Sequence, residues 1–410
     1  MAVEESQNMK DAVKNASYNM VLQVFFRLST FSMNAVMLRY LSREILGVMN
    51  VRLMLLYSTM LFISREAFRK SCLTQQENEG EKDKTAVKIQ LKRMINLTWL
   101  CSIVGLLSSI VLYSVWTSWL PQPASEILDQ YKNATLLISI GCIIELFAEP
   151  FWILSQRNYF LSLKVIFEGV YLAIRCFLST LLVVYFPKNA LLMYGVSFLI
   201  ASILYLSCYV IYFWNYMSKD KDNKTKELSN LENFANLLPD LTIKPMFHQD
   251  YMNLIASFYK QSMLKQFLTE GERYIMTIFG ILSFSQQGVY DVINNLGSLA
   301  ARFIFMPIEE TYYTYFSKVL SRGKCGKQQN EGSLNEAANS LYLVLKFVST
   351  IGAIILVFGY SYSFMLLDLY GGKILSENEG LFINVVDKLK IFQQLKKIYE
   401  KITFDFSKVI

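Results

Sequence analysis

Long apolar segments separated by short polar stretches constrain this chain more than any other feature. They can be read at 18–38, 45–63, 95–119, 134–154, 163–186, 189–214, 256–283, 288–316 and 339–367. A helix needs about 20 apolar residues to cross a bilayer, and strands are usually much shorter than that. Only 18% of the 410 residues are charged, against roughly 25% in soluble proteins. The sequence therefore predicts an all-α fold, a polytopic membrane helix bundle.

Basic residues are distributed unevenly between alternate loops. The stretch 65–94 carries eight of them, and 317–338 carries another group, whereas the opposite loops contain only Arg39, Arg43, Lys132 and Lys188. Cytosolic loops of membrane proteins are enriched in Lys and Arg. We therefore expect a cytosolic N-terminus. The net charge of +7 is spread over loops rather than one face, so no nucleic-acid partner is predicted.

An eleven-residue pattern occurs twice. Residues 41–51 read LSREILGVMNV and residues 282–292 read LSFSQQGVYDV, with five identical positions at a constant offset of 241. Repeats with the same orientation are typical of transporters whose halves are related by an axis along the membrane normal. We expect two pseudo-repeat lobes around a central cavity, the second incomplete. The predicted parts are a cytosolic N-terminal segment (1–17), an N-lobe of six transmembrane helices (18–214), a cytosolic inter-lobe linker (215–255), a partial C-lobe (256–373) and a variant amphipathic tail (374–410).

Ionisable side chains occur inside several predicted spans, where a charge costs about 2.5–3.5 kcal/mol. Glu145 and Glu149 are expected one turn apart on a single helix face, and Lys164 and Glu168 are expected to form an i,i+4 pair. Charges near span ends usually snorkel or pair locally, and this is the expectation for Arg52, Lys164 and Arg175. The deeper charges, Arg27, Glu145, Arg273 and Arg302, indicate a water-filled cavity. Because arginine suits phosphate, such a lining favours a lipid with an anionic headgroup.

Motifs of common enzymes and metal sites do not occur in the sequence. We find no GxxxxGK[ST], HExxH or GxSxG, and the six cysteines show no metal-ligand spacing. We predict no enzymatic activity, no cofactor and no metal, and expect the cysteines to be small packing residues. His248, the only histidine, is expected to be solvated.

Several long strings resemble one family of membrane proteins. They are FFRLSTFSMNAVMLRYLSREILGVMNVRLMLLYSTMLFISREAFRKSC at 25–72, EPFWILSQ at 149–156, KQFLTEGERYIMT at 265–277 and GVYDVINNLGSLAARFIFMPIEE at 288–310. By these strings the chain resembles the Rft family over about residues 18–373. The resemblance implies a branch of the multidrug/oligosaccharidyl-lipid/polysaccharide flippase superfamily, in which two six-helix lobes surround a cavity.

The resemblance also implies a function and a site. The cargo would be a mannose-rich dolichol-diphosphate-linked oligosaccharide. It would move from the cytosolic to the lumenal leaflet of the endoplasmic reticulum membrane for protein N-glycosylation, with the bilayer and glycan-assembly enzymes as further partners. Its diphosphate would lie near Arg27, Arg65 and Arg302. The implied substrate-binding residues are Arg27, Arg65, Glu66, Glu149, Lys164, Glu270, Arg273, Asp291, Arg302 and Glu309.

Three alternatives stay open. One is a non-transporting scaffold for glycan assembly. Another is an ion-coupled multidrug-type antiporter, which would need a dedicated carboxylate such as Glu145, Glu149 or Glu270. A membrane glycosyltransferase would need a catalytic acidic cluster, and the sequence shows none.

The C-terminal residues 376–410 depart from the family pattern. Val386, Leu389, Phe392 and Leu395 recur every three residues among lysines, as in an amphipathic helix. We expect a truncated or alternatively spliced ending. An interfacial helix lying on the membrane is the alternative.

Overall fold

The structure is a computed structural model. It describes residues 29, 31–74, 84–158, 160–218, 233–240, 242–246, 249–297 and 331–371, together with 305, 308, 312 and 316. These residues form helices and connecting turns, without a strand in any of these ranges. The chain divides into two compact units, a first unit of residues 1–288 and a second unit of residues 289–410.

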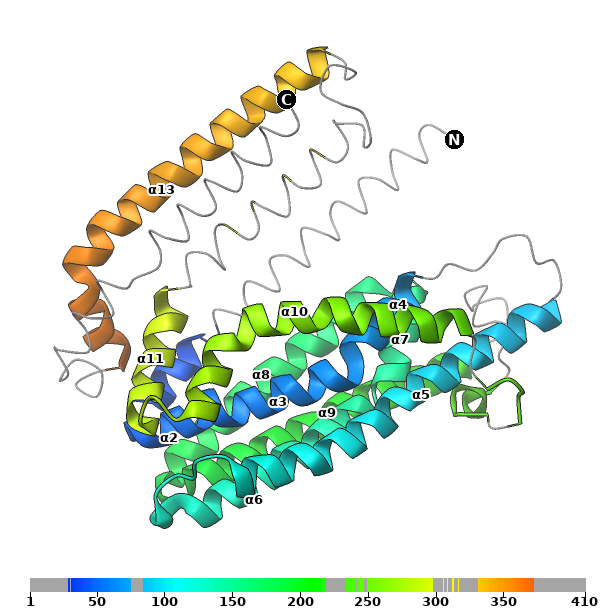
Figure 1. Ribbon diagram of the computed structural model, residues 1–410, viewed down its shortest axis with the longest axis horizontal. Coiled ribbons are helices and arrows are strands. Elements are labelled where there is room, and N and C mark those ends of the chain that lie inside the picture. Colours follow the sequence, from blue (N-terminus) through cyan, green and yellow to red (C-terminus); the bar gives the residue numbers. More distant parts are fainter. Residues whose placement is uncertain are drawn as a thin grey trace. The chain divides into compact units, whose positions relative to one another are not determined.

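Most described helices belong to the first unit. Their bounds are α2 (Arg43–Gly47), η1 (Val48–Leu53), α3 (Met54–Leu61), η2 (Phe62–Glu66), α4 (Ala67–Thr74), α5 (Lys84–Ser114), η3 (Val115–Trp119), α6 (Ser125–Leu146), α7 (Glu149–Arg157), α8 (Leu161–Tyr185), η4 (Pro187–Asn189), α9 (Ala190–Met217), η7 (Phe234–Leu237) and α10 (Gln249–Phe279). Helix α6 packs along α9 and also contacts α5, and the short α3 contacts α5 and α6 (Figure 1). Helix α8 packs on α9, and α10 packs on α4.

Two helices include residues of the second unit. Helix α11 (Phe284–Gly297) begins in the first unit and continues beyond residue 288, and α13 (Glu331–Gly371) lies entirely in the second. The predicted lobe boundaries at 214 and 256 stay a prediction. The predicted tail at 374–410 and His248 lie outside the described residues.

Six described helical segments are long and apolar enough to cross a membrane. They are Arg43–Thr74, Lys88–Trp119, Ser125–Arg157, Ser162–Tyr185, Pro187–Met217 and Leu334–Ile355. The prediction of an all-α polytopic membrane bundle is confirmed. The span expected at 256–283 is a helix, α10, but its five charged residues between Lys260 and Arg273 keep it out of this group of six.

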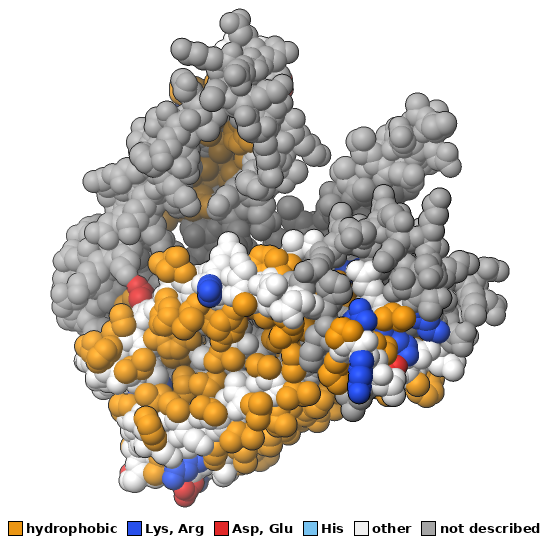
Figure 2. Space-filling model, turned by 45° about the vertical axis from the view of Figure 1, so that its right-hand side comes forward, with side chains coloured by type: hydrophobic (Ala, Val, Ile, Leu, Met, Phe, Trp, Pro, Cys, Tyr) orange, Lys and Arg blue, Asp and Glu red, His pale blue; other side chains and the backbone are white. Residues whose placement is uncertain are grey.

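Hydrophobic side chains cover much of one face of the described residues (Figure 2). On α5, Ile103, Leu107, Ile110 and Val111 are each more than half exposed. An exposed apolar patch of this size would be unfavourable in water. Such a patch fits a surface that contacts lipid acyl chains.

Cys72, Cys101, Cys142 and Cys176 are buried packing residues, as predicted.

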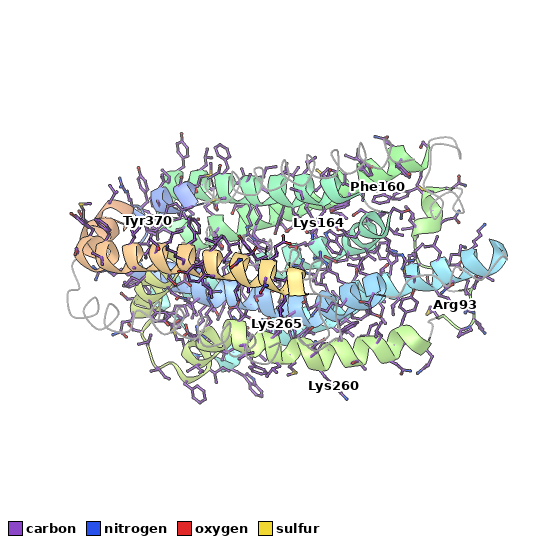
Figure 3. The ribbon with its side chains drawn as sticks, turned by 90° about the horizontal axis from the view of Figure 1, so that it is seen from above. Arg93, Phe160, Lys164, Lys260, Lys265 and Tyr370 are labelled. Atoms are coloured by element: carbon purple, nitrogen blue, oxygen red, sulfur yellow. The ribbon has the colours of Figure 1, made fainter. Side chains whose placement is uncertain are left out.

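The ends of the helices gather into two groups of loops, as the alternating spans predict. At one end, Arg157 Nη1 donates to the carbonyl of Cys72 (3.1 Å), and Lys92 pairs with Asp240 (2.6 Å). Arg93 and Phe160 also lie toward this end (Figure 3). At the other end, the backbone N–H of Ala124 donates to Glu44 at 3.3 Å. The loops predicted to share one membrane side therefore meet.

The two copies of the repeated pattern share their local structure. Ser42 Oγ accepts from the N–H of Ile45 at 3.3 Å, and Ser283 Oγ accepts from the N–H of Gln286 at 3.3 Å. Each serine therefore caps the helix that follows it. Ser283 and Gln286 each lie 241 positions after their counterparts Ser42 and Ile45. This agreement supports the internal repeat.

Candidate functional site

Glu145, near the end of α6, accepts hydrogen bonds from three side chains. Tyr57 Oη donates to Oε2 at 2.8 Å, and Tyr171 Oη donates to the same oxygen at 3.1 Å. Arg65 Nη1 reaches Oε1 at 2.8 Å. Glu145 is only 4% exposed, so a carboxylate buried between apolar helices is neutralised and hydrogen-bonded, as a buried charge requires.

Glu149, the first residue of α7, forms a two-pronged ion pair with Arg69. Arg69 Nε donates to Oε2 and Nη2 donates to Oε1, both at 2.6 Å. Arg65 Nη1 also lies 3.5 Å from Oε1 of Glu149. Arg65 therefore bridges the two glutamates. We call these four residues, Arg65, Arg69, Glu145 and Glu149, the arginine–glutamate cluster.

A helix break places both glutamates. They were predicted on one helix face, but α6 ends at Leu146 and α7 begins at Glu149, so they belong to two helices. Pro150 lacks an N–H and cannot donate to the carbonyl of Leu146. That carbonyl accepts from Ser102 Oγ at 3.0 Å instead. The carbonyl of Leu146 thus keeps a hydrogen-bond donor at the break, and the break places both carboxylates next to the arginines.

The arginines come from a helix whose regularity is interrupted nearby. Arg65 lies in the π-helical turn η2, and such turns are frequent at functional sites. Arg69 follows one turn later in α4. Residues 65–74 were predicted as part of a loop, but the helix continues to Thr74, because the buried glutamates neutralise its basic residues.

Trp152 extends the cluster toward α8. The guanidinium of Arg69 lies 3.6 Å from the centroid of the Trp152 ring, and Lys164 Nζ lies 5.2 Å from it. Both are cation–π distances. Glu168 accepts from Trp152 Nε1 at 2.9 Å. The predicted ion pair between Lys164 and Glu168, both described, is not made, because each side chain contacts Trp152 instead; Figure 3 labels Lys164.

Two further predicted site residues, Glu270 and Arg273, lie on α10, and a third, Glu66, contacts this helix. Glu270 accepts from Arg273 Nη1 at 3.0 Å and from Ser58 Oγ at 3.4 Å. Glu66 lies 3.7 Å from Lys265 Nζ and 3.3 Å from Lys70 Nζ. These pairs are more exposed than the cluster; the Glu66 side chain is 32% exposed.

The remaining predicted residues are not part of this arrangement. Arg27, Arg302 and Glu309 lie outside the described residues. Asp291 belongs to the second unit, is 3% exposed, and accepts from Asn295 Nδ2 at 2.8 Å. Of the ten predicted site residues, the structure thus brings two pairs into direct contact, Arg65 with Glu149 and Glu270 with Arg273. Lys164 lies beside the first pair, across Trp152.

Arg52 contradicts the expectation that it snorkels to the membrane surface. It is 1% exposed, and its three guanidinium nitrogens have no hydrogen-bond partner among the described residues. The ring of Phe284 lies 5.0 Å from the guanidinium carbon. Packing around the π-helical turn η1, which contains Arg52, leaves the side chain no path to water.

Arg69, Tyr57, Tyr171 and Trp152 were not predicted as site residues. A signal for Arg69 existed: Arg65 and Arg69 have the same four-residue spacing as Glu145 and Glu149. Two such pairs on facing helices can match charge for charge. The aromatic residues carried no comparable signal, because Phe, Trp and Tyr together make up 14% of the chain and occur in every predicted span.

No group of His, Cys, Asp and Glu that could hold a metal ion occurs in the part of the chain that the structure describes. The long apolar helices and the ion pairs buried between them define a multi-pass α-helical membrane protein.

The comparisons identify the family. The family model described as Rft protein matches residues 11–390. The Man(5)GlcNAc(2)-PP-dolichol translocation protein RFT1 of Xenopus tropicalis is 42% identical over 91% of this chain and 67% of its own length. The proteins of the same name from Mus musculus and Saccharomyces cerevisiae are 40% and 27% identical, each over 90% of this chain. No solved structure matches.

The chain belongs to the Rft family. It spans about two thirds of the length of the curated relatives it matches.

Proposed function

We propose that this chain takes part in the transfer of a dolichol-diphosphate-linked oligosaccharide across the endoplasmic reticulum membrane, from the cytosolic to the lumenal leaflet, and that it is not an enzyme. One observation carries the proposal. A chain 42% identical to a protein named for this translocation holds four charged residues, Arg65, Arg69, Glu145 and Glu149, between its apolar helices. Ionisable residues within membrane spans usually mark the route of a polar substrate.

The cluster combines rigidity with partial access. Glu145 and Glu149 are buried, whereas the side chains of Arg65 and Arg69 are 23% and 16% exposed. The carboxylates fix the two guanidinium groups, and a face of each stays accessible. Fixed arginines beside an accessible surface suit a diphosphate or the hydroxyls of a sugar chain.

The antiporter alternative is less well supported. It needs a carboxylate that takes up and releases an ion or proton. Glu145 and Glu149 each contact an arginine within 2.8 Å, so both carboxylates are already engaged in structural ion pairs. A loss of activity on dissipation of the proton gradient would favour the antiporter after all.

The basic loops support a cytosolic N-terminus. A single added glycosylation sequon in the loop around Lys188 tests this orientation. With a cytosolic N-terminus, we expect this sequon to be glycosylated. We expect the same sequon placed near Lys92 to stay unmodified.

Rescue of yeast cells depleted of their own RFT1 protein tests the function. We expect this chain to restore the glycosylation of a secreted reporter, and a variant with Arg65→Gln and Arg69→Gln to restore less. The chain extended to the full length of its relatives is the positive control. If the extended chain rescues and this chain produces no more glycosylation than an empty vector, the proposal is wrong for this chain.

A further inference from the structure

Arg175 is a cation that the arginine–glutamate cluster does not neutralise. In the cluster, two arginines face two glutamates. Arg175 lies beside it on α8, next to Tyr57 and Tyr171, the two tyrosines that bind Glu145. No described carboxylate lies within ion-pair distance of Arg175, and none of its nitrogens donates a hydrogen bond to a described residue. The described residues around Arg175 therefore carry one excess positive charge.

Three aromatic rings hold the Arg175 side chain. Its guanidinium carbon lies 5.4 Å from the ring centroid of Phe198, 5.5 Å from that of Tyr171 and 5.8 Å from that of Tyr57. Cation–π contacts use the flat faces of a guanidinium and the rings. They leave the N–H donors at its edge without a partner among the described residues, so the group is positioned but its donors stay available.

The tyrosine rings are themselves fixed. Both tyrosine hydroxyls donate to Oε2 of Glu145, at 2.8 and 3.1 Å, and the Tyr57 ring packs edge-on against Phe198 at 4.9 Å between centroids. A cation held by rigid rings loses little conformational freedom when it binds a ligand. The site is thus built around Arg175 rather than formed by chance on a mobile surface.

The position of Arg175 requires a polar partner. Contrary to the expectation of a charge near a span end, Arg175 lies near the middle of α8, a segment long and apolar enough to span a membrane, and it is only partly buried. A partly buried cation that pairs with no described residue is costly at this depth unless water or an anion reaches it. Arg65, the arginine predicted to bind the diphosphate, already bridges Glu145 and Glu149 and has fewer donors to offer.

We propose that Arg175 binds the diphosphate of the lipid-linked substrate through the edge of its guanidinium. This inference rests on the proposed function and adds a residue to it. The planar fork of arginine can donate two parallel hydrogen bonds to two oxygens of one phosphate. The rings of Tyr57, Tyr171 and Phe198 hold the fork, and Glu145 orders the rings.

Calorimetric titration of the full chain in detergent tests the inference, with farnesyl diphosphate as the probe and farnesol as its uncharged counterpart. We expect the wild-type chain to prefer the diphosphate. Arg175→Gln should weaken the binding of farnesyl diphosphate by about 10- to 100-fold, which corresponds to one or two charge-assisted hydrogen bonds. The binding of farnesol should stay unchanged. Lys188→Gln, which removes the same charge from an exposed turn, is the matched control and should bind as the wild type does.

Two further variants separate binding from folding. Arg175→Met keeps an apolar stem between the rings and should lose diphosphate binding without a change in melting temperature. Arg175→Lys keeps the charge but lacks the fork, so we expect an intermediate loss, and it decides the question if the other two do not fold. An affinity of Arg175→Lys or Arg175→Gln for farnesyl diphosphate equal to that of the wild type overturns the inference. If the wild-type chain itself does not prefer farnesyl diphosphate over farnesol, the proposed diphosphate-linked substrate is wrong, and the inference is wrong as well.

Discussion

Gly47 and Gly288, the equivalent glycines of the repeated pattern, pack directly against each other's helix. A Cβ added to Gly47 would overlap the carbonyl oxygen of Phe284, and one added to Gly288 would overlap the carbonyl oxygen of Arg43. Phe284 stands in the second copy where Arg43 stands in the first. The contact is therefore reciprocal, as expected for two copies related by a local two-fold axis.

Substitution of either glycine by alanine should destabilise the first unit. The added methyl group would meet backbone atoms, which cannot move aside as a flexible side chain can, and overpacking of this kind costs about 1–3 kcal/mol. Gly271→Ala is the matched control, because no atom lies within 4 Å of its added Cβ, and it should be neutral or slightly stabilising. Thermal unfolding in detergent measures the difference. A Gly47→Ala chain as stable as the Gly271→Ala chain would show that the close contact does not exist.

Removal of one partner from the Arg69–Glu149 pair should be costly. Glu149→Gln leaves Arg69 without the buried carboxylate that it contacts, and the loss of one member of a buried pair costs about 3–5 kcal/mol. Glu66→Gln is the comparison, since this side chain is 32% exposed and such pairs contribute about 0–1 kcal/mol. The free energy of unfolding of both variants decides the point. Equal losses would mean that Glu149 is solvated rather than buried.

The sequence predicted the charged site only in part. Arg65 and Glu149 were assigned to the site by the resemblance to the Rft family, whereas Glu145 was singled out because charges deep inside apolar spans are rare. Arg69 was assigned to a loop because the apolar run ends before it. Its helix continues only because Glu149 and Trp152 of another helix neutralise and cover it. A tertiary contact of that kind has no local signal in the sequence.

The same limit applies to backbone geometry. The interval between Glu145 and Glu149 predicted one helix, and the break at Phe147 depends on Pro150 together with Ser102, which lies 44 residues from the carbonyl it satisfies. The unpaired state of Arg52 could not be predicted either, because it depends on how tightly α2, η1 and the start of α11 pack. The all-α bundle itself was predictable, since apolar length alone determines it.

Asn96 fastens the linker between α9 and α10 to α5. Its side chain donates to the carbonyl of Asp240 at 2.8 Å and accepts from the N–H of Asp240 at 2.7 Å. Trp99 Nε1 adds a bond to the carbonyl of Leu237 at 2.9 Å. We expect Asn96→Ala to release this segment and to speed chymotryptic cleavage after Phe234 by several-fold. Asn133→Ala, at an exposed position on α6, is the control and should leave the cleavage rate unchanged.

The linker attachment should also depend on pH. Hydrogen bonds from Lys92 and then from Thr242 lower the pKa of Asp240 from 3.8 to about 2. Because the pKa of the attached state is the lower one, the attachment is at full strength above about pH 4 and weakens as the pH falls toward 2. Hydrogen exchange of the backbone around Asp240, corrected for the intrinsic rate, should accelerate in this window. Asp240→Asn should remove the pH dependence, and an unchanged pH profile in that variant would exclude Asp240 as the titrating group.

Reconstitution in liposomes tests most directly whether this bundle moves the headgroup of a dolichol-linked oligosaccharide. The measurement is the rate at which a labelled lipid-linked oligosaccharide becomes accessible from the opposite leaflet. The account predicts a faster rate with the wild-type chain than in protein-free liposomes, and a rate reduced toward that background with Arg65→Gln. Lys188→Gln should retain the wild-type rate. A wild-type rate equal to that of protein-free liposomes would contradict the account and favour a scaffold that assists another transporter.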